Sequence, residues 1–194
     1  FLNFDLDEDD FNTIDKSIVS SRDFKIPKFD NYTLLHLDEK WILNDYIQSY
    51  KSIEPISEKS LINFIEQLIL KTNNNVYIST GSFPNKFTDF FKINFLMTGK
   101  NTYEFKILNK RVIFFDNISF LHLEKLILNS TLLITCHGAP THVAASFNKT
   151  IVDIIDTSEL EFFNKWTAHF RDYNFCLRTN FTDLSKNILI SLDS

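Results

Sequence analysis

The chain has 194 residues, 44% of them hydrophobic, and a formal net charge of −5. This composition can form the core of one domain, and the mixed charges offer no basic stripe for a phosphate backbone, which argues against nucleic acid as a partner. No apolar run approaches the ~18 residues that a membrane-spanning helix needs, and the acidic N-terminus is unlike a signal peptide.

The elements predicted along the chain alternate between strands and helices. Residues 1–30 lack clear periodicity and are interpreted as a connector or edge segment, and residues 31–194 as one domain. Short apolar runs predict buried strands, and apolar residues at helical spacing predict helices between them. In chain order we expect strand 32–37, a helix capped by Ser57 and stopped by the Asn run 73–75, strand 76–80, helix 83–91, strand 111–116, helix 119–130, strand 132–136, helix 140–147, strand 150–155, helix 158–172, strand 174–179 and helix 181–192.

This alternation is typical of a parallel sheet with helices on both faces, so the predicted fold class is α/β, Rossmann-like. In such an open sheet, ligands bind beyond the carboxyl ends of the strands, near the point where the strand order reverses. The strand ends are therefore candidate binding positions. They include Thr80 with Gly81, Asp156, and the stretch 136–142.

The stretch 136–142, "CHGAPTH", joins a buried strand to a helix. Gly138 can let the backbone approach a phosphate closely or turn through positive φ, and Pro140 suits the first turn of a helix. Free N–H groups at a helix N-terminus favour an anion, and hydroxyl and imidazole groups can add hydrogen bonds. A diphosphate fits this chemistry, and the residues expected to bind it are His137, Gly138, Ala139, Thr141 and His142.

The same stretch resembles glycosyltransferase family 9, the heptosyltransferase-like enzymes. That family carries a strand followed by Asp-Thr-Gly-Pro-x-His-x-Ala-Ala and then another strand. The matching residues here are Gly138, Pro140, His142, Ala144 and Ala145, followed by strand 150–155. Two departures are visible: Ala139 is an extra residue between Gly and Pro, and Cys136 with His137 replaces Asp-Thr.

A second stretch, "LLHLDEKW", is similar to the start of the same domain in this family. His36, Lys40 and Trp41 follow an apolar strand in the family's order, without its proline. The resemblance implies that Lys40 lies near the diphosphate of the donor. Together the two motifs span roughly residues 32–180, which corresponds to the C-terminal, donor-binding half of a two-domain GT-B transferase.

The resemblance implies transfer of a sugar, hexosyl or heptosyl, from a nucleotide-sugar to a glycan or lipopolysaccharide-type acceptor, without metal or other cofactor. It implies that the catalytic base lies in an N-terminal domain, so no catalytic residue is assigned here. Since the chain starts at Phe1 and its single methionine is Met97, we expect a longer protein. The expected location is the cytoplasm. Peripheral contact with the inner face of the membrane is compatible with this expectation.

Three alternatives to the transferase remain open. They are a nucleotide-sugar epimerase, a polyol-phosphate transferase of the teichoic type, and a degenerate domain that acts as an assembly scaffold. A metal site at His137 and His142 is not expected, because their spacing of five is not one helical turn and no carboxylate neighbour in the sequence completes the set. Cys136 and Cys176 lie in apolar segments and predict buried free thiols in a reducing compartment.

Overall fold

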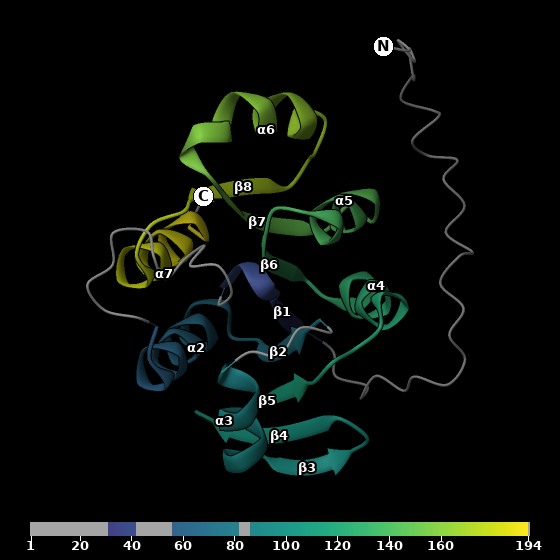
Figure 1. The fold of residues 1–194 in the computed structure, drawn as a ribbon, viewed down its shortest axis with the longest axis vertical. Coiled ribbons are helices and arrows are strands. Elements are labelled where there is room, and N and C mark those ends of the chain that lie inside the picture. The colour runs from purple at the N-terminus through teal and green to yellow at the C-terminus, as the bar shows by residue number, and fades with distance from the viewer. Residues whose placement is uncertain (1–30, 42–55, 82–85, 194) are drawn as a thin grey trace.

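A computed structural model describes residues 31–41, 56–81 and 86–193 (Figure 1). The expected connector, residues 1–30, lies outside these ranges. The strands are β1 (Tyr32–Leu37), β2 (Asn75–Thr80), β3 (Leu96–Gly99), β4 (Thr102–Ile107), β5 (Lys110–Phe115), β6 (Leu132–Cys136), β7 (Thr150–Ile155) and β8 (Tyr173–Leu177). The helices are α2 (Glu58–Thr72), α3 (Lys86–Asn94), α4 (Phe120–Asn129), α5 (Ala139–Ser146), α6 (Leu160–Thr167) and α7 (Phe181–Ser191), with 3-10 turns η2 (Glu39–Trp41) and η4 (Thr157–Glu159).

The strands form one eight-stranded sheet in the order β3-β4-β5-β2-β1-β6-β7-β8. From β5 to β8 every neighbouring pair is parallel, which confirms the predicted α/β, Rossmann-like class. The chain moves from β1 to β2, continues at the outer edge with β3, and comes back inward through β4 to β5. It then crosses to the other side of β1 with β6, β7 and β8. The strand order therefore reverses between β1 and β6.

The antiparallel strands β3 and β4 extend one edge of the sheet, and the sequence did not predict them. All of Leu96, Met97 and Thr98 are exposed, so β3 carries no apolar run or inward-facing alternation. Such a strand is defined by its pairing with β4 and not by burial, and its sequence pattern is correspondingly weak. The predicted parallel sheet therefore continues at this edge into an antiparallel hairpin.

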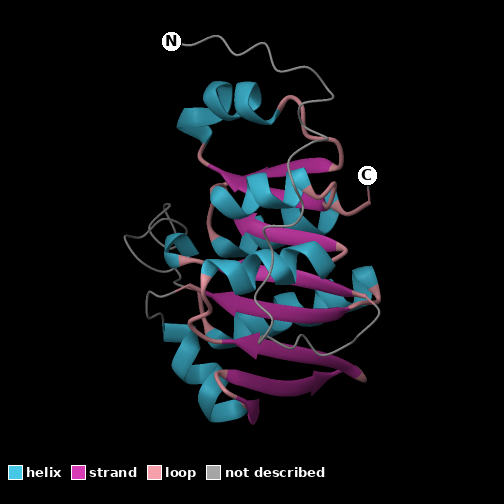
Figure 2. Ribbon diagram, turned by 90° about the vertical axis from the view of Figure 1, so that its right-hand side faces the viewer, coloured by secondary structure: helices cyan, strands magenta, loops and turns pink. Residues whose placement is uncertain are grey.

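Helices cover both faces of the sheet, as predicted (Figures 1 and 2). One core cluster packs α2, α3 and α7 against one face, with Phe64, Phe91 and Leu184 buried there. The other packs α4 and α5 against the opposite face. Ser57 and Ser119 cap α2 and α4, because each side chain accepts a hydrogen bond from an N–H of the first turn.

The helix predicted over 158–172 is shorter in the structure. Residues 157–159 form the 3-10 turn η4, and α6 ends at Thr167. The Thr167 hydroxyl donates to the Phe163 carbonyl oxygen at 2.9 Å, a bond that competes with continued helix. The following residues instead lead back to β8. Of the helices in the described ranges, none is long and apolar enough to cross a membrane.

His36 on the central strand β1 is buried and shares a hydrogen bond of 3.0 Å with the Ser79 hydroxyl. Burial lowers the pKa of His36 from 6.5 to about 4. Between pH 6.5 and about pH 4, His36 binds a proton in the unfolded chain but not in the folded chain. Its contribution to stability is therefore fully present above pH 6.5 and is lost as the pH falls through this range. We expect His36 to lower the free energy of unfolding at pH 4 by about 3 kcal/mol relative to pH 7.

Urea unfolding of the wild type and of His36→Gln between pH 7 and pH 4 measures this contribution. Carboxylates also titrate in that range, so the difference between the two pH profiles is the informative quantity. His169→Gln, at an exposed histidine, is the control for removing an imidazole outside the core. Parallel profiles for the wild type and His36→Gln would show that His36 does not carry this pH dependence.

Candidate functional site

The carboxyl ends of β1 and β6 lie side by side at the point where the strand order reverses, and the region beyond these two strand ends is called the β1–β6 crevice. Leu34 of β1 stands in register with Leu133 of β6, and both strands end at the same edge of the sheet. Asp38 directly follows β1, and Lys40 lies in the turn η2 that comes next. The residues after β6 begin α5. This is the position at which open α/β sheets bind their ligands.

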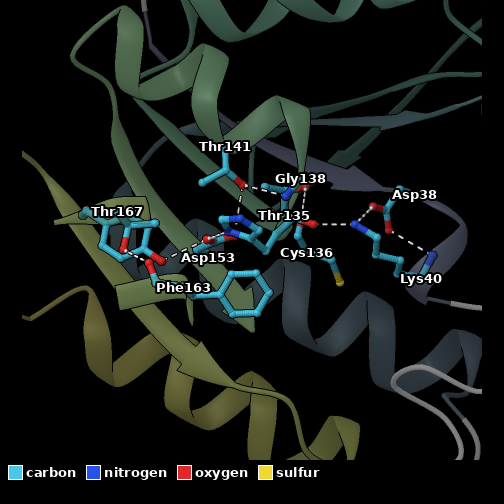
Figure 3. A network of polar contacts seen from close by, with 11 residues as sticks. Asp38, Lys40, Thr135, Cys136, Gly138, Thr141, Asp153, Phe163 and Thr167 are labelled. Atoms are coloured by element: carbon cyan, nitrogen blue, oxygen red, sulfur yellow. Dashed lines mark hydrogen bonds and ion pairs between the residues drawn. The ribbon is translucent and has the colours of Figure 1, made fainter. Parts of the chain in front are cut away.

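Lys40 connects the segment after β1 with the segment after β6 through hydrogen bonds. Its Nζ donates a hydrogen bond to the carbonyl oxygen of His137, and it lies 3.9 Å from Oδ2 of Asp38 (Figure 3). The backbone N–H of Lys40 also donates to Asp38 Oδ1, at 3.1 Å. An ammonium has three donors, so Lys40 retains hydrogen-bonding capacity for an anion. The structure thus brings together Lys40 and the turn at 137–138, which are 97 positions apart in sequence.

Gly138 is needed at this turn for close approach and not for its backbone angles. Its φ of 167° is ordinary extended backbone, so the alternative of a turn through positive φ was wrong. A Cβ placed on Gly138 would lie 3.2 Å from Lys40 Nζ and 3.7 Å from Pro140 Cδ. The absence of a side chain therefore makes room for the ammonium group directly in front of the turn.

The first turn of α5 offers fewer free amides than its sequence suggested. The Thr141 N–H donates to the Gly138 carbonyl oxygen at 3.0 Å, and the His137 N–H donates to Ile154 at 3.0 Å. The Gly138 N–H makes a long contact of 3.4 Å with the Thr141 hydroxyl oxygen. No described residue accepts a hydrogen bond from the Ala139 N–H, which lies at the exposed start of the helix. Ala139 is therefore the amide that can meet a ligand.

Thr141 lies inside the protein and not at the surface beyond the strand ends. It is fully buried, and its hydroxyl donates to Oδ1 of Asp153 at 3.0 Å. Both its amide and its hydroxyl have partners within the protein, so Thr141 stabilises the turn. Its neighbour His142 is exposed, and its ring packs edge-on against the ring of His137, with centroids 5.4 Å apart.

Asp153, in the middle of β7, is the main residue of this site that sequence reasoning did not assign. Its exposed fraction is 0%, and it accepts hydrogen bonds from three side chains. Oδ1 takes the Thr141 hydroxyl, while Oδ2 takes the Tyr173 hydroxyl at 2.9 Å and Nδ1 of His137 at 2.5 Å (Figure 3). A buried carboxylate requires such donors. A single acid in the apolar run "TIVDII" was the available signal.

The remaining candidates lie one strand away from the crevice on either side. Thr80, at the end of β2, is buried, and its hydroxyl accepts the Asn117 N–H at 3.1 Å. A Cβ on Gly81 would meet nothing within 4 Å, so that position is open. Asp156, after β7, forms an ion pair with Arg178 and accepts the Ser158 N–H at 2.9 Å, and this hydrogen bond lowers the pKa of its carboxyl. Thr80 and Asp156 thus already serve the protein's own contacts.

Metal binding and thiol reactivity would depend on the His, Cys, Asp and Glu side chains. Among the residues that the structure describes, no group of three or more His, Cys, Asp or Glu side chains is arranged to hold a metal ion. Cys136 and Cys176 are free and buried, as predicted. Burial raises the pKa of the Cys136 thiol well above its usual value, which keeps it protonated and unreactive.

Comparison with known proteins identifies a similar fold. No protein-family model matches the sequence, and no curated protein matches it either. The chain is similar in structure to the UDP-GlcNAc 2-epimerase from Methanocaldococcus jannaschii, with a TM-score of 0.52 and 15% identity over 87% of this chain and 40% of that one. A putative UDP-N-acetylglucosamine 2-epimerase from Listeria monocytogenes superimposes with a TM-score of 0.48 and 14% identity, over 96% of this chain and 43% of that one.

The first of these likenesses shows the fold, a GT-B-like, Rossmann-like α/β domain. The chain spans 40% of the length of that epimerase.

Proposed function

We propose that the chain binds the diphosphate of a nucleotide-sugar in the crevice between β1 and β6, as the donor-binding domain of a glycosyltransferase. The observation that carries this proposal is the position of Lys40. Its ammonium group lies in front of Gly138, at the reversal of strand order, and the next residue of the turn, Ala139, is exposed. A cation, an amide and the positive end of a helix together form a site for a phosphate group.

The same groups suit the chemistry of sugar transfer. When the bond between the sugar and the diphosphate breaks, negative charge develops on the departing diphosphate. Fixed donors at that position stabilise the charge without reorganisation. In the resemblance to glycosyltransferase family 9, the base that activates a glycan or glycolipid acceptor comes from another domain. We therefore expect the 194-residue chain to bind nucleotides without turnover.

A nucleotide-sugar epimerase is the second candidate, favoured by the fold likeness to a UDP-GlcNAc 2-epimerase. The two candidates share the diphosphate site and differ in what happens to the sugar. A transferase consumes an acceptor and releases a nucleoside diphosphate, whereas an epimerase converts the nucleotide-sugar without an acceptor. Product analysis of the protein with any further domain it carries separates them.

Isothermal titration of the chain with UDP, GDP, ADP and CDP tests the binding proposal. We expect at least one of the four to bind with a Kd below about 1 mM, equivalent to about −4 kcal/mol. Heat from none of them would contradict the proposal and favour the scaffold alternative. Equal Kd values for all four would indicate recognition of the diphosphate without selection of the base.

Lys40→Met is expected to weaken binding of the tightest of these nucleotides by about tenfold to a hundredfold, because a charge-assisted hydrogen bond to phosphate contributes about 1.5–3 kcal/mol. Methionine keeps the length of the aliphatic chain and removes the charge. Lys100→Met, at an exposed lysine between β3 and β4, is the matched control and should bind as the wild type does. Equal affinity of Lys40→Met and the wild type would remove Lys40 from the site.

A further inference from the structure

We propose that Asp153 and His137 form a carboxylate–imidazole pair in which Asp153 holds the proton on Nδ1 of His137 and so presents Nε2 to the diphosphate. This inference rests on the binding function proposed above. It adds to it a positioning residue, Asp153, and a proton that the ligand requires. Neither follows from the presence of a cation and a helix N-terminus alone.

The contacts of Asp153 determine which nitrogen of His137 carries the proton. Asp153 is fully buried, and its Oδ2 lies 2.5 Å from Nδ1 of His137. An ionised carboxylate can only accept hydrogen bonds, so Nδ1 must be the donor. The Tyr173 hydroxyl donates to the same oxygen at 2.9 Å, and burial together with Asp153 raises the pKa of this phenol, which keeps its proton. The imidazole is thus anchored through Nδ1.

The other nitrogen of His137, Nε2, differs from Nδ1 in its hydrogen bonding. Nε2 has no hydrogen-bond partner among the residues that the structure describes, and it is not sealed from solvent. The side chain as a whole is only 12% exposed, because the ring of Phe163 packs on it with centroids 4.2 Å apart. Packing and the bond to Asp153 therefore fix the ring, while Nε2 has no partner within the described part of the chain. This arrangement is typical of a histidine that contacts a ligand.

His137 also belongs to the crevice through its backbone, since its carbonyl oxygen accepts the hydrogen bond from Lys40 Nζ. His137 thus contacts Lys40 through its backbone and Asp153 through its ring. A diphosphate has two phosphate groups, and two neighbouring donor groups suit it better than one.

The ionisable groups around His137 come from four elements. Asp153 in β7 and His142 in α5 contact its ring, and Lys40 in η2 contacts its carbonyl oxygen. Tyr173 in β8 shares the Asp153 oxygen, and α6 contributes the uncharged Phe163. Partial burial lowers the pKa of His142, and a positive charge on His137 lowers it further. The two neighbouring histidines therefore favour one positive charge between them.

Both phosphate groups of a nucleotide-sugar are disubstituted, so their oxygens carry no proton near neutral pH and, like those of a fully ionised nucleoside diphosphate, only accept hydrogen bonds. Nε2 must therefore carry a proton to bind them. The buried carboxylate of Asp153 compensates the resulting charge on the imidazole. A nucleotide that meets a neutral His137 therefore binds together with one proton from the solvent. The N–H bond at Nε2 is the only bond formed, and no covalent bond of the ligand changes.

Nuclear magnetic resonance of the 194-residue chain with ¹⁵N-labelled histidine reports both nitrogens directly. At a pH where the ring is neutral, we expect His137 to carry its proton on Nδ1. Addition of the tightest-binding nucleoside diphosphate among UDP, GDP, ADP and CDP is expected to protonate Nε2 and leave Nδ1 protonated.

Three variants separate this role from a structural one. His137→Gln is expected to weaken binding by about tenfold. Asp153→Asn should release the fixed tautomer and weaken binding similarly. Tyr173→Phe removes the other donor to the same carboxylate oxygen and is expected to keep the Nδ1 tautomer and an affinity within about twofold of the wild type. Should Asp153→Asn fail to fold, the wild-type spectrum and His137→Gln decide.

The outcomes distinguish this inference from the proposed function. If a nucleotide binds while the Nε2 signal is unchanged, or His137→Gln binds as tightly as the wild type, the pair is structural and the inference is wrong, whereas the diphosphate site stands. If the proton of His137 lies on Nε2 before addition, the inference is also wrong. If none of the four nucleotides binds, the proposed function and this inference are both overturned.

Discussion

Asp153→Ala is expected to lower the free energy of unfolding by about 4 kcal/mol, a loss typical of breaking a buried charged network. Asp153 is fully buried and accepts hydrogen bonds from Thr141, Tyr173 and His137. Alanine removes all three acceptor contacts and leaves the buried Thr141 hydroxyl without its partner. Urea unfolding at pH 7 measures the change.

Asp172→Ala is the control for this variant, since Asp172 is exposed in the segment just before β8. Its effect is expected to stay within about 0.5 kcal/mol. A similarly small effect of Asp153→Ala would mean that the network at the end of β6 does not organise the turn. The orientation of His137 would then need another explanation.

Gly138→Val is expected to reduce nucleotide affinity by at least about a hundredfold, equivalent to about 2.8 kcal/mol. The Cβ of any larger residue would lie 3.2 Å from Lys40 Nζ, and the two branches of valine would occupy the space in front of the turn. The Lys40 ammonium group must then shift away from the turn, and the valine branches are expected to keep a phosphate from the Ala139 N–H. Because φ is 167°, valine fits the backbone and the domain is expected to fold.

Thermal unfolding and titration of the same samples separate these two effects. Gly99→Val is the matched control, since Gly99 ends β3 and its nearest contact would be Thr102 at 3.7 Å. We expect Gly138→Val to lose binding with a nearly unchanged Tm, and Gly99→Val to keep binding. Retained binding in Gly138→Val would place the nucleotide away from this turn.

Much of the fold could be predicted because its strands are buried on both faces. Strand β1 begins and ends at the predicted residues, since "YTLLHL" is a continuous buried run. The edge hairpin of β3 and β4 could not be predicted in this way, because β3 has no buried residue and pairs through its backbone. The order of the strands, which creates the crevice, depends on pairing between distant segments.

The candidate site was only partly predictable for a related reason. The turn at Gly138 and Pro140 is a local pattern, and it is visible in sequence. Asp153 acts through Thr141, His137 and Tyr173, which are 12, 16 and 20 positions away, and no short motif connects them. Its signal was chemical: an acidic residue within an apolar strand requires nearby donors.

A crystal structure with the tightest-binding of the four nucleoside diphosphates tests the central claim most directly. The account predicts the diphosphate at the carboxyl ends of β1 and β6, with phosphate oxygens within hydrogen-bonding distance of Lys40 Nζ and the Ala139 N–H. A diphosphate bound elsewhere, for example at Lys92 and Asp116 beyond β5, would contradict it.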